Sequence, residues 1–488
     1  MGPVLPARDA RLEPDGTSLS VAAPADRGGC GRGGTAAPGG PRGQAAGDAT
    51  QSARRPLRKD QRVGAVRAAQ EDRHRLSGGG THVAFTWGAL TSILRAKQRW
   101  DADGGTSFDL VSLSGTSAGA LCALATWYGL APNGSDPDCG TVDKAVERLD
   151  HLWTVFAATN PAETLHNLAG QVLLRWKAAG VALPESSPYA AAGRLGLLGL
   201  GSVGARPEYL GFQGLLASLC PDFDSVDWKL LAQNNVRVIA GAIEVLSGNF
   251  ETFDSDKTLE ELGLKPPPER DQYGATRWRM RRALSLDGVA ASGTLPELLP
   301  AQPIENLEFP TADEGTTIRR TGYYWDGLYS QNPPVRDLLD TETCDDKPDE
   351  IWVVRINPQE YSPTSLRVGL EEIRDRENDL AGNLSLNQEL DHILTVNRWI
   401  DKYGNDAPPL TDRKTVVVRT IKMSRDSAWT LDHASKLDRS PRHLAALRAE
   451  GTELTERWLA DWRAAGDGFP GTRPTPGIRK AGMCRTSL

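Results

Sequence analysis

Short apolar runs alternate with segments of helical periodicity between residues 84 and 356, and this alternation most constrains the fold. The run "FDLVSLS" (108–114) predicts a buried strand, and "AGALCALATWYGL" (118–130) predicts a small-residue helix packed closely on a sheet. Further strands are expected at 236–246, 249–255, 322–327 and 350–358, and helices at 85–100, 144–156, 164–180, 207–219 and 277–292. Strands that alternate with helices predict a three-layer α/β domain with a mainly parallel sheet.

The flanking regions differ from this pattern. Residues 1–70 are rich in Gly, Pro, Ala, Ser and Arg, so they cannot bury enough apolar surface to offset the entropy of ordering and are expected to be disordered. The α/β domain is assigned to 74–358, with a helical cap at 144–219. Residues 359–465 are expected to form a mostly helical C-terminal extension, whose first helix (365–404) is interrupted near Gly382, and 466–488 a flexible tail.

Composition excludes several functional classes. The net charge of −7 argues against a nucleic-acid-binding protein. The six cysteines are scattered without a CxxC pair, so neither a zinc module nor a disulfide framework is expected. No apolar signal core or run of about 20 apolar residues is present, which predicts a cytoplasmic protein. The basic end of the 1–70 segment offers peripheral contact with a membrane surface, although a solvated tail is favoured. The oligomeric state is not predicted.

The first chemical motif is "GTSAG", which directly follows the predicted strand at 108–114. Gly115, Ala118 and Gly119 are small enough to let a strand and a helix meet in a tight turn around Ser117. The amides at the start of the helix favour negative charge developing beside that serine. This is the local geometry that acyl transfer requires; a flexible Gly/Ser loop is the alternative.

Two further motifs flank the serine in the sequence. "LSGGGTH" (76–82) has three consecutive glycines before a helix, which can expose backbone amides to an anion, or can serve as a flexible connector. "YYWDGLYSQNPP" (323–334) places Asp326 at a strand end, where it can act as a base or accept a hydrogen bond within a turn.

The three motifs, in this order, resemble those of the patatin-like phospholipase family. "AASGTLPELLP" (290–300) and "DGLYSQNPP" (326–334) are similar to further segments of that family, and the resemblance covers about residues 76–356. It implies a three-layer α/β/α patatin-like domain and a serine lipid acyl hydrolase that needs no cofactor or metal. Ser117 would be the nucleophile and Asp326 its base. The amides of Gly78, Gly79 and Gly80 would form the oxyanion hole, and Gly327 would complete the Asp-Gly motif.

Two alternatives stay open. An α/β-hydrolase triad would need a histidine after Asp326, and His392, His433 and His443 satisfy that order. A degenerate module that binds a lipid or a partner without catalysis is favoured by the polar stretch "QEDRHRLS" (70–77), because a central parallel strand is normally apolar. Three tryptophans could face a lipid surface, but packing in the core or the cap is the favoured role for Trp153, Trp176 and Trp228.

Overall fold

A computed structural model gives the fold of the chain. The chain divides into two compact units, Met1–Arg67 and Ala68–Leu488, and the described residues all belong to the second. The described residues are 80–104, 107–131, 140–178, 204–223, 236–255, 279–295, 300–310, 317–339, 347–356, 360, 370–405 and 410–465. The expected disordered segment 1–70, the stretch 70–77 and the tail 466–488 lie outside them, as do Gly78, Gly79 and Trp228.

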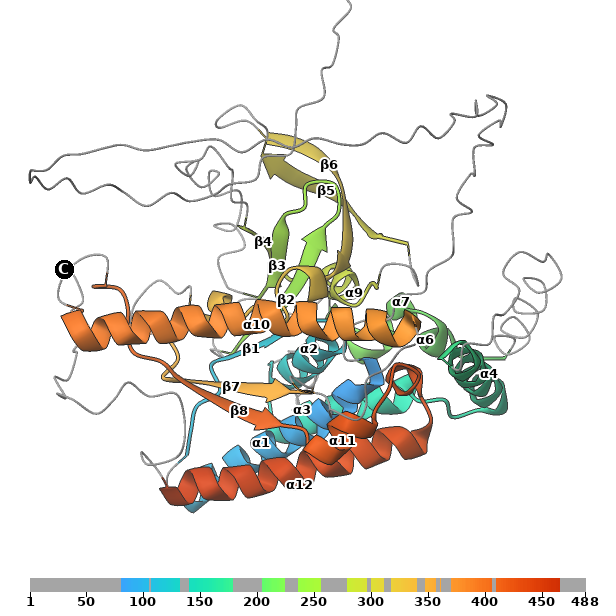
Figure 1. Ribbon diagram of the computed structural model, residues 1–488, viewed down its shortest axis with the longest axis horizontal. Coiled ribbons are helices and arrows are strands. Elements are labelled where there is room, and N and C mark those ends of the chain that lie inside the picture. Colours follow the sequence, from blue (N-terminus) through green and yellow to red (C-terminus); the bar gives the residue numbers. More distant parts are fainter. Residues whose placement is uncertain are drawn as a thin grey trace, which may run out of the picture. The chain divides into compact units, whose positions relative to one another are not determined.

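The central sheet has six strands in the order β4-β3-β2-β6-β5, with β1 paired to β2 (Figure 1). Its strands are β1 Ser112–Gly115, β2 Arg237–Glu244, β3 Phe250–Asp254, β4 Arg279–Ala283, β5 Gln302–Pro310 and β6 Thr317–Asp326. The pairs β1–β2 and β3–β4 are parallel, whereas β2–β3, β2–β6 and β5–β6 are antiparallel. A second sheet pairs β7 (Glu350–Arg355) with β8 (Val417–Lys422) in parallel. The α/β class is confirmed, and the central sheet mixes both strand directions.

One edge of β2 is shared by two strands that lie end to end. β1 pairs with Arg237–Ala240, and β6 pairs with Ala242–Glu244. β3 occupies the opposite edge, at Ile239–Ile243. Because β1 runs parallel to β2 and β6 runs antiparallel, the carboxyl ends of β1 and β6 meet beside Gly241.

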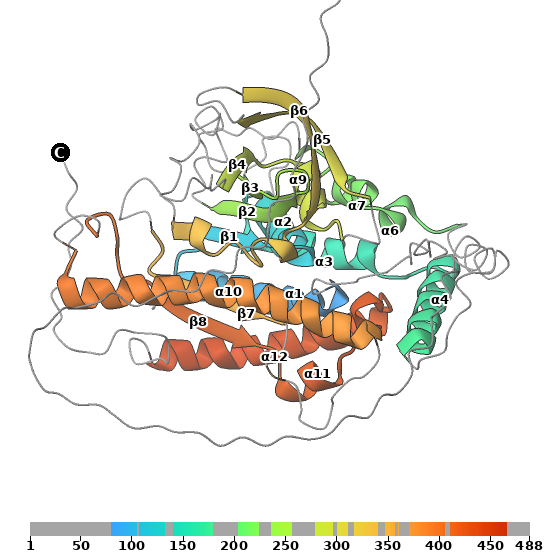
Figure 2. The ribbon, with the colours of Figure 1, turned by 45° about the horizontal axis from the view of Figure 1, so that its top comes forward.

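Helices cover the two sheets (Figure 2). They are α1 Ala84–Asp103, α2 Ala118–Leu130, α3 Val142–Phe156, α4 Pro161–Ala178, α6 Pro207–Leu210, α7 Phe212–Leu219, α9 Leu286–Ser292, α10 Leu370–Tyr403, α11 Arg425–Thr430 and α12 Pro441–Ala465. Short 3-10 helices are η1 Gly80–Val83, η3 Gly327–Tyr329, η4 Arg336–Leu339 and η5 Ser435–Leu437. The expected helices at 85–100, 144–156, 164–180 and 207–219 are confirmed, the last as two short helices.

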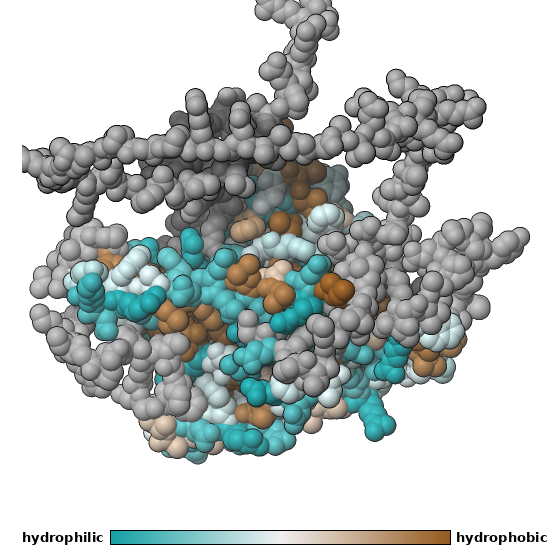
Figure 3. Space-filling model, in the orientation of Figure 1, coloured by the Kyte–Doolittle hydropathy of each residue, from teal (hydrophilic) through white to brown (hydrophobic). Residues whose placement is uncertain are grey.

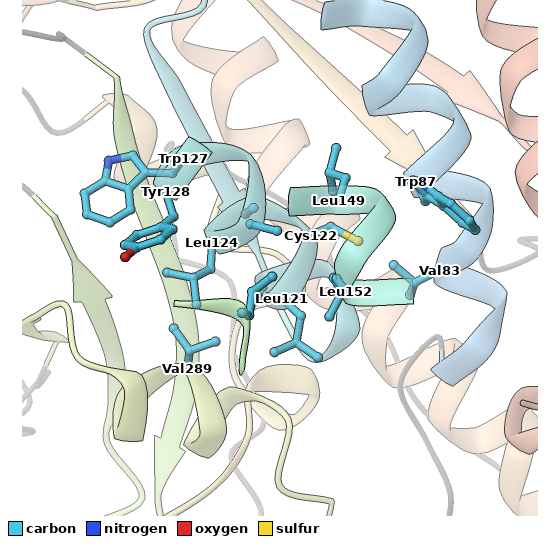
Figure 4. Packing of buried hydrophobic residues seen from close by; sticks show 14 of the residues in the cluster. Val83, Trp87, Leu121, Cys122, Leu124, Trp127, Tyr128, Leu149, Leu152 and Val289 are labelled. Atoms are coloured by element: carbon cyan, nitrogen blue, oxygen red, sulfur yellow. The ribbon is translucent and has the colours of Figure 1, made fainter. Parts of the chain in front are cut away.

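The core is built around α2, whose apolar side chains are buried almost all round (Figure 4). Leu121 and Leu124 pack in one cluster with Leu149 and Leu152 of α3. A Cβ on Gly129 would lie 2.4 Å from the Cα of Ala145, so the glycine allows α2 and α3 to cross closely. Gly129 therefore serves close packing against α3, and α2 also contacts β1 and β2 of the sheet on which the sequence predicts that it packs.

Two expected elements are corrected. Residues 277–292 do not form one helix: β4 comes first, and α9 begins after Ser285, whose Oγ accepts a hydrogen bond from the Gly288 amide at 3.0 Å. The extended strand is favoured because Arg281 and Arg282 reach buried carboxylates on β3. The interruption near Gly382 is also wrong, since α10 is continuous over 34 residues.

Gly382 allows close packing rather than a break. A Cβ there would lie 2.5 Å from Nδ2 of Asn332 and 2.8 Å from Cδ1 of Leu328. The opposite side of α10 faces outward, and Figure 3 shows brown residues among teal ones over this helix, where Leu380 and Leu384 are exposed. α10 therefore lies directly over the turn that follows β6.

The strand β1 is less buried than "FDLVSLS" predicts. Three of its four residues are partly buried, and the preceding Val111 is 39% exposed. The reason is a cavity of about 1200 Å³, which is lined by β1 and its flanking residues (107–116) and by residues 347–356 around β7. The expectation of a buried strand is wrong for three of the four residues of β1.

Candidate active site

Ser117 lies in a strained turn between β1 and α2. Its backbone has φ 59° and ψ −134°, a combination that is costly for a residue with a side chain. A Cβ on Gly115 would lie 2.4 Å from the carbonyl group of Gly119, so the turn requires glycine at 115. A Cβ on Gly119 itself would meet nothing within 4 Å, so the close approach of strand and helix requires glycine at 115 and not at 119. Ser117 itself is 7% exposed.

The amide of Ser117 is held by Ser292, the last residue of α9. It donates to both the carbonyl oxygen and the Oγ of Ser292, each at 3.1 Å. The next amide, that of Ala118, is the first of α2, and no described residue accepts a hydrogen bond from it. An unpaired amide at the start of a helix can stabilise an anion beside the serine.

Asp326 lies at the carboxyl end of β6, opposite Ala242 of β2. Its side chain is fully buried, and Oδ1 accepts a hydrogen bond from the Leu328 amide at 2.8 Å. Burial raises the pKa of Asp326 to about 7, and hydrogen bonding with the Leu328 amide and the Ser117 hydroxyl partly offsets the rise. Oδ2 accepts no hydrogen bond of ordinary geometry from the described residues.

The shared edge of β2 brings these two side chains together. The chain leaves β1 at Gly115, opposite Ala240, and β6 ends at Asp326, opposite Ala242. The glycine of the Asp-Gly motif is required here, since a Cβ on Gly327 would lie 2.3 Å from the carbonyl oxygen of Gly241. A buried carboxylate and a strained serine thus share one junction between strands.

Three neighbours of Ser117 and Asp326 are not among the residues that the sequence predicts for the site. Ser292 holds the Ser117 amide, and Thr116 donates through Oγ1 to the carbonyl oxygen of Gln331 at 2.8 Å. Ser292 and Gln331 fall in "AASGTLPELLP" and "DGLYSQNPP", the two segments that support the resemblance. Their place in these two segments was the sequence signal for both residues, although no role was predicted for either one.

The glycine-rich segment is described from Gly80 onward. Gly80 has φ +49°, and a Cβ there would lie 2.2 Å from the carbonyl oxygen of Lys436 in η5. The buried His82 follows it within η1, at the start of α1. The last of the three predicted glycines therefore precedes a helix, as expected, and lies in a conformation that favours glycine.

The three histidines after Asp326 lie in other surroundings. His392 is on the exposed side of α10, whereas His433 lies 3.5 Å from Asp375. The ring of His443 lies 6.2 Å from that of His82. Among the described residues, the groups that interact with the Asp326 carboxyl are the Leu328 amide and the Ser117 hydroxyl, and no histidine is among them.

The order and geometry of these motifs agree with a comparison against known families. A family model described as patatin-like phospholipase matches residues 76–339, more than half of the 488-residue chain. The chain belongs to the patatin-like phospholipase family. A search of curated proteins finds no match. This patatin-like phospholipase therefore carries the general function of its family, the hydrolysis of acyl groups from lipids.

None of the helices in the described ranges is long and apolar enough to cross a membrane. Trp153 is buried and stacks on Trp87, with ring centroids 6.0 Å apart, which confirms its packing role. Trp176 is 52% exposed, so a core role is wrong for that residue. The family match ends at Leu339, before β7, α10, β8 and α12.

Proposed function

We propose that the protein hydrolyses carboxylic esters of lipids through a Ser117–Asp326 dyad and an acyl-enzyme. The observation that carries this proposal is the fully buried Asp326, whose carboxyl group interacts with the hydroxyl of Ser117 in its strained turn. Ser117 Oγ attacks the ester carbonyl while its proton passes to the Asp326 carboxylate. The alcohol leaves with a proton, and water then releases the fatty acid from the serine.

The electrostatics of Asp326 support its role as the base. An unperturbed aspartate, with a pKa near 4, accepts a proton from a hydroxyl group poorly at neutral pH. Burial raises the pKa of Asp326 to about 7, which makes its carboxylate a stronger base at that pH. The buried surroundings also exclude water from the proton transfer.

The oxyanion hole is assigned to two backbone segments. The amides of Gly78, Gly79 and Gly80 supply one side, as the family resemblance implies. The Ala118 amide, which has no described acceptor, supplies the other side from the start of α2. Loss of one such donor commonly lowers kcat by about 10²–10³.

The first experiment combines turnover of a p-nitrophenyl butyrate substrate with labelling by a fluorophosphonate probe. We expect wild type to hydrolyse the ester and to label at one serine. Ser117→Ala should abolish both readouts, whereas Asp326→Asn should lower turnover by at least about 10²-fold. Ser92→Ala replaces another buried serine that lies in α1, and it is the matched control that should retain both readouts.

The same assay separates the alternatives. A Ser-Asp-His triad predicts that alanine at one of His392, His433 or His443 abolishes turnover, whereas the dyad predicts that none of the three does. A module that binds lipid without catalysis predicts a folded wild type that neither labels nor turns over. That last result would refute the proposed hydrolase activity.

A further inference from the structure

The segment that begins at the third glycine is held by a segment more than 350 residues away. Thr81 Oγ1 donates to the carbonyl oxygen of Ser435 at 2.7 Å, and His82 Nε2 lies 2.8 Å from Ser435 Oγ. Gly80 packs directly on the backbone of Lys436, where any Cβ would overlap the carbonyl oxygen. Three consecutive residues of η1 are thus in contact with two residues of η5.

The hydrogen bonds of Ser435 determine which residue is the donor and which the acceptor in its contact with His82. The hydroxyl hydrogen of Ser435 is donated to the carbonyl oxygen of Asp432 at 2.7 Å. Its Oγ is therefore an acceptor toward His82, and Nε2 of the imidazole carries the donated hydrogen. Burial, aided by the nearby Lys436 ammonium, holds the pKa of His82 well below its usual range, so the ring is neutral. Ser435 thereby orients the imidazole of His82 in one tautomer.

η5 is in turn fixed to α10 by a buried ion pair. Lys436 Nζ lies 2.6 Å from Asp375 and 2.9 Å from Asp379, which are one helical turn apart. All three side chains are almost fully buried, and breaking such a pair leaves an uncompensated charge. Through Gly382, α10 also packs on Leu328, two residues after Asp326. One helix thus supports both the η5 contact and the aspartate turn.

We propose that Ser435 is a positioning residue, and that η5 and α10 hold η1 in the conformation that lets the Gly80 amide serve the oxyanion hole. This inference rests on the proposed function. It makes the C-terminal extension a required part of the catalytic unit, although the family match ends at Leu339. Ser435 touches η1 and no proposed catalytic atom, so it acts through Thr81 and His82.

The test compares three variants of the full chain with wild type. Ser435→Ala removes the acceptor for His82, together with the hydrogen bonds that the same Oγ makes with the amide and the carbonyl oxygen of Asp432. Ser435→Thr restores a hydroxyl group. Ser424→Ala is the matched control, because Ser424 lies in the same extension and caps α11 through a 3.2 Å hydrogen bond from the Ser427 amide. Fluorophosphonate titration counts the active sites, and p-nitrophenyl butyrate gives kcat and KM for each site.

For Ser435→Ala we expect complete labelling and an unchanged KM, with kcat per labelled site lowered by about 10- to 100-fold, since small displacements of catalytic groups have effects of this size. Ser435→Thr and Ser424→Ala should stay within about threefold of wild type. A structural role alone would instead lower the labelled fraction and leave kcat per site unchanged.

The outcomes separate this inference from the proposed function. A wild type without labelling refutes the hydrolase itself. An active wild type together with a folded Ser435→Ala of normal kcat per site refutes the positioning role alone. If Ser435→Ala does not fold, Thr81→Val replaces it, because valine keeps the shape of threonine while removing the hydrogen bond to Ser435. The same fall in kcat is then expected, and its absence overturns the inference.

Discussion

At the scale of single residues, the pKa of Asp326 predicts how the rate of hydrolysis depends on pH. Its pKa of about 7 predicts that kcat/KM for p-nitrophenyl butyrate falls about tenfold for each pH unit below 7 and levels off above that pH, because the base must be ionised. The measurement is a pH–rate profile from pH 5 to 9, with the fluorophosphonate labelling rate as a second readout. A profile that is flat across this range would exclude Asp326 as the base.

The same carboxyl group makes stability depend on pH. Between the unfolded pKa of 3.8 and the folded value of about 7, the folded protein binds more protons, so the free energy of unfolding falls as pH rises. The difference of about three units corresponds to at most about 4 kcal/mol. Asp326→Asn removes this ionisation. We expect the variant to melt at a higher temperature than wild type at pH 8.5.

The control is the same comparison of melting temperatures, between Asp326→Asn and wild type, at a lower pH. At pH 4.5 Asp326 is protonated in the folded protein and the pH is less than one unit above the unfolded pKa of 3.8, so the advantage of the asparagine variant should shrink to about 1 kcal/mol. Thermal unfolding followed by circular dichroism at both pH values measures the difference. An equal shift in melting temperature at both pH values would show that the effect has nothing to do with ionisation.

At the scale of elements, the crossing of α1 and α12 depends on two glycines. A Cβ on Gly451 would lie 2.0 Å from the carbonyl oxygen of Phe85, and one on Gly88 would lie 2.1 Å from that of Arg448. Gly451→Ala should therefore destabilise the protein by about 1–3 kcal/mol, because the backbones must move apart. The urea midpoint for unfolding measures this change.

Gly170→Ala in α4 is the matched control for this substitution. A Cβ at Gly170 meets nothing within 4 Å, and alanine favours a helix over glycine. The control should thus stabilise the protein by up to about 1 kcal/mol. Were Gly451→Ala to stabilise as well, the close contact between α1 and α12 would be contradicted.

Some of the helices, strands and site residues can be predicted from the sequence, and others cannot. Periodicity predicts β2 and α1, because each has a pattern of its own, and the motif order predicts that Ser117 and Asp326 share a site. The strand at 279–283 is not predicted from its local sequence, because its partners Glu251 and Asp254 lie on β3, more than 20 residues earlier in the chain. Ser435 had no local signal, since its role depends on contacts that only the folded chain creates.

At the scale of the whole molecule, the C-terminal extension shares its core with the region of the family match. Leu444, Leu447 and Leu459 of α12 belong to the same buried cluster as the apolar residues of α1 and α2. Trp462 stacks on Trp100 with ring centroids 5.8 Å apart, within a wider group of aromatic rings. Figure 1 shows α1 and α12 running side by side. The extension therefore buries surface that the matched region would otherwise expose to water.

Because that core is continuous, the extension and the matched region should unfold together. Under increasing urea we expect helical ellipticity, tryptophan fluorescence and fluorophosphonate labelling to be lost in one transition with coincident midpoints. An extension with a core of its own would give two transitions, with part of the ellipticity lost before labelling. Early loss of labelling alone would instead indicate a locally unstable site. Coincident midpoints therefore distinguish one cooperative unit from a domain with an appended helical module.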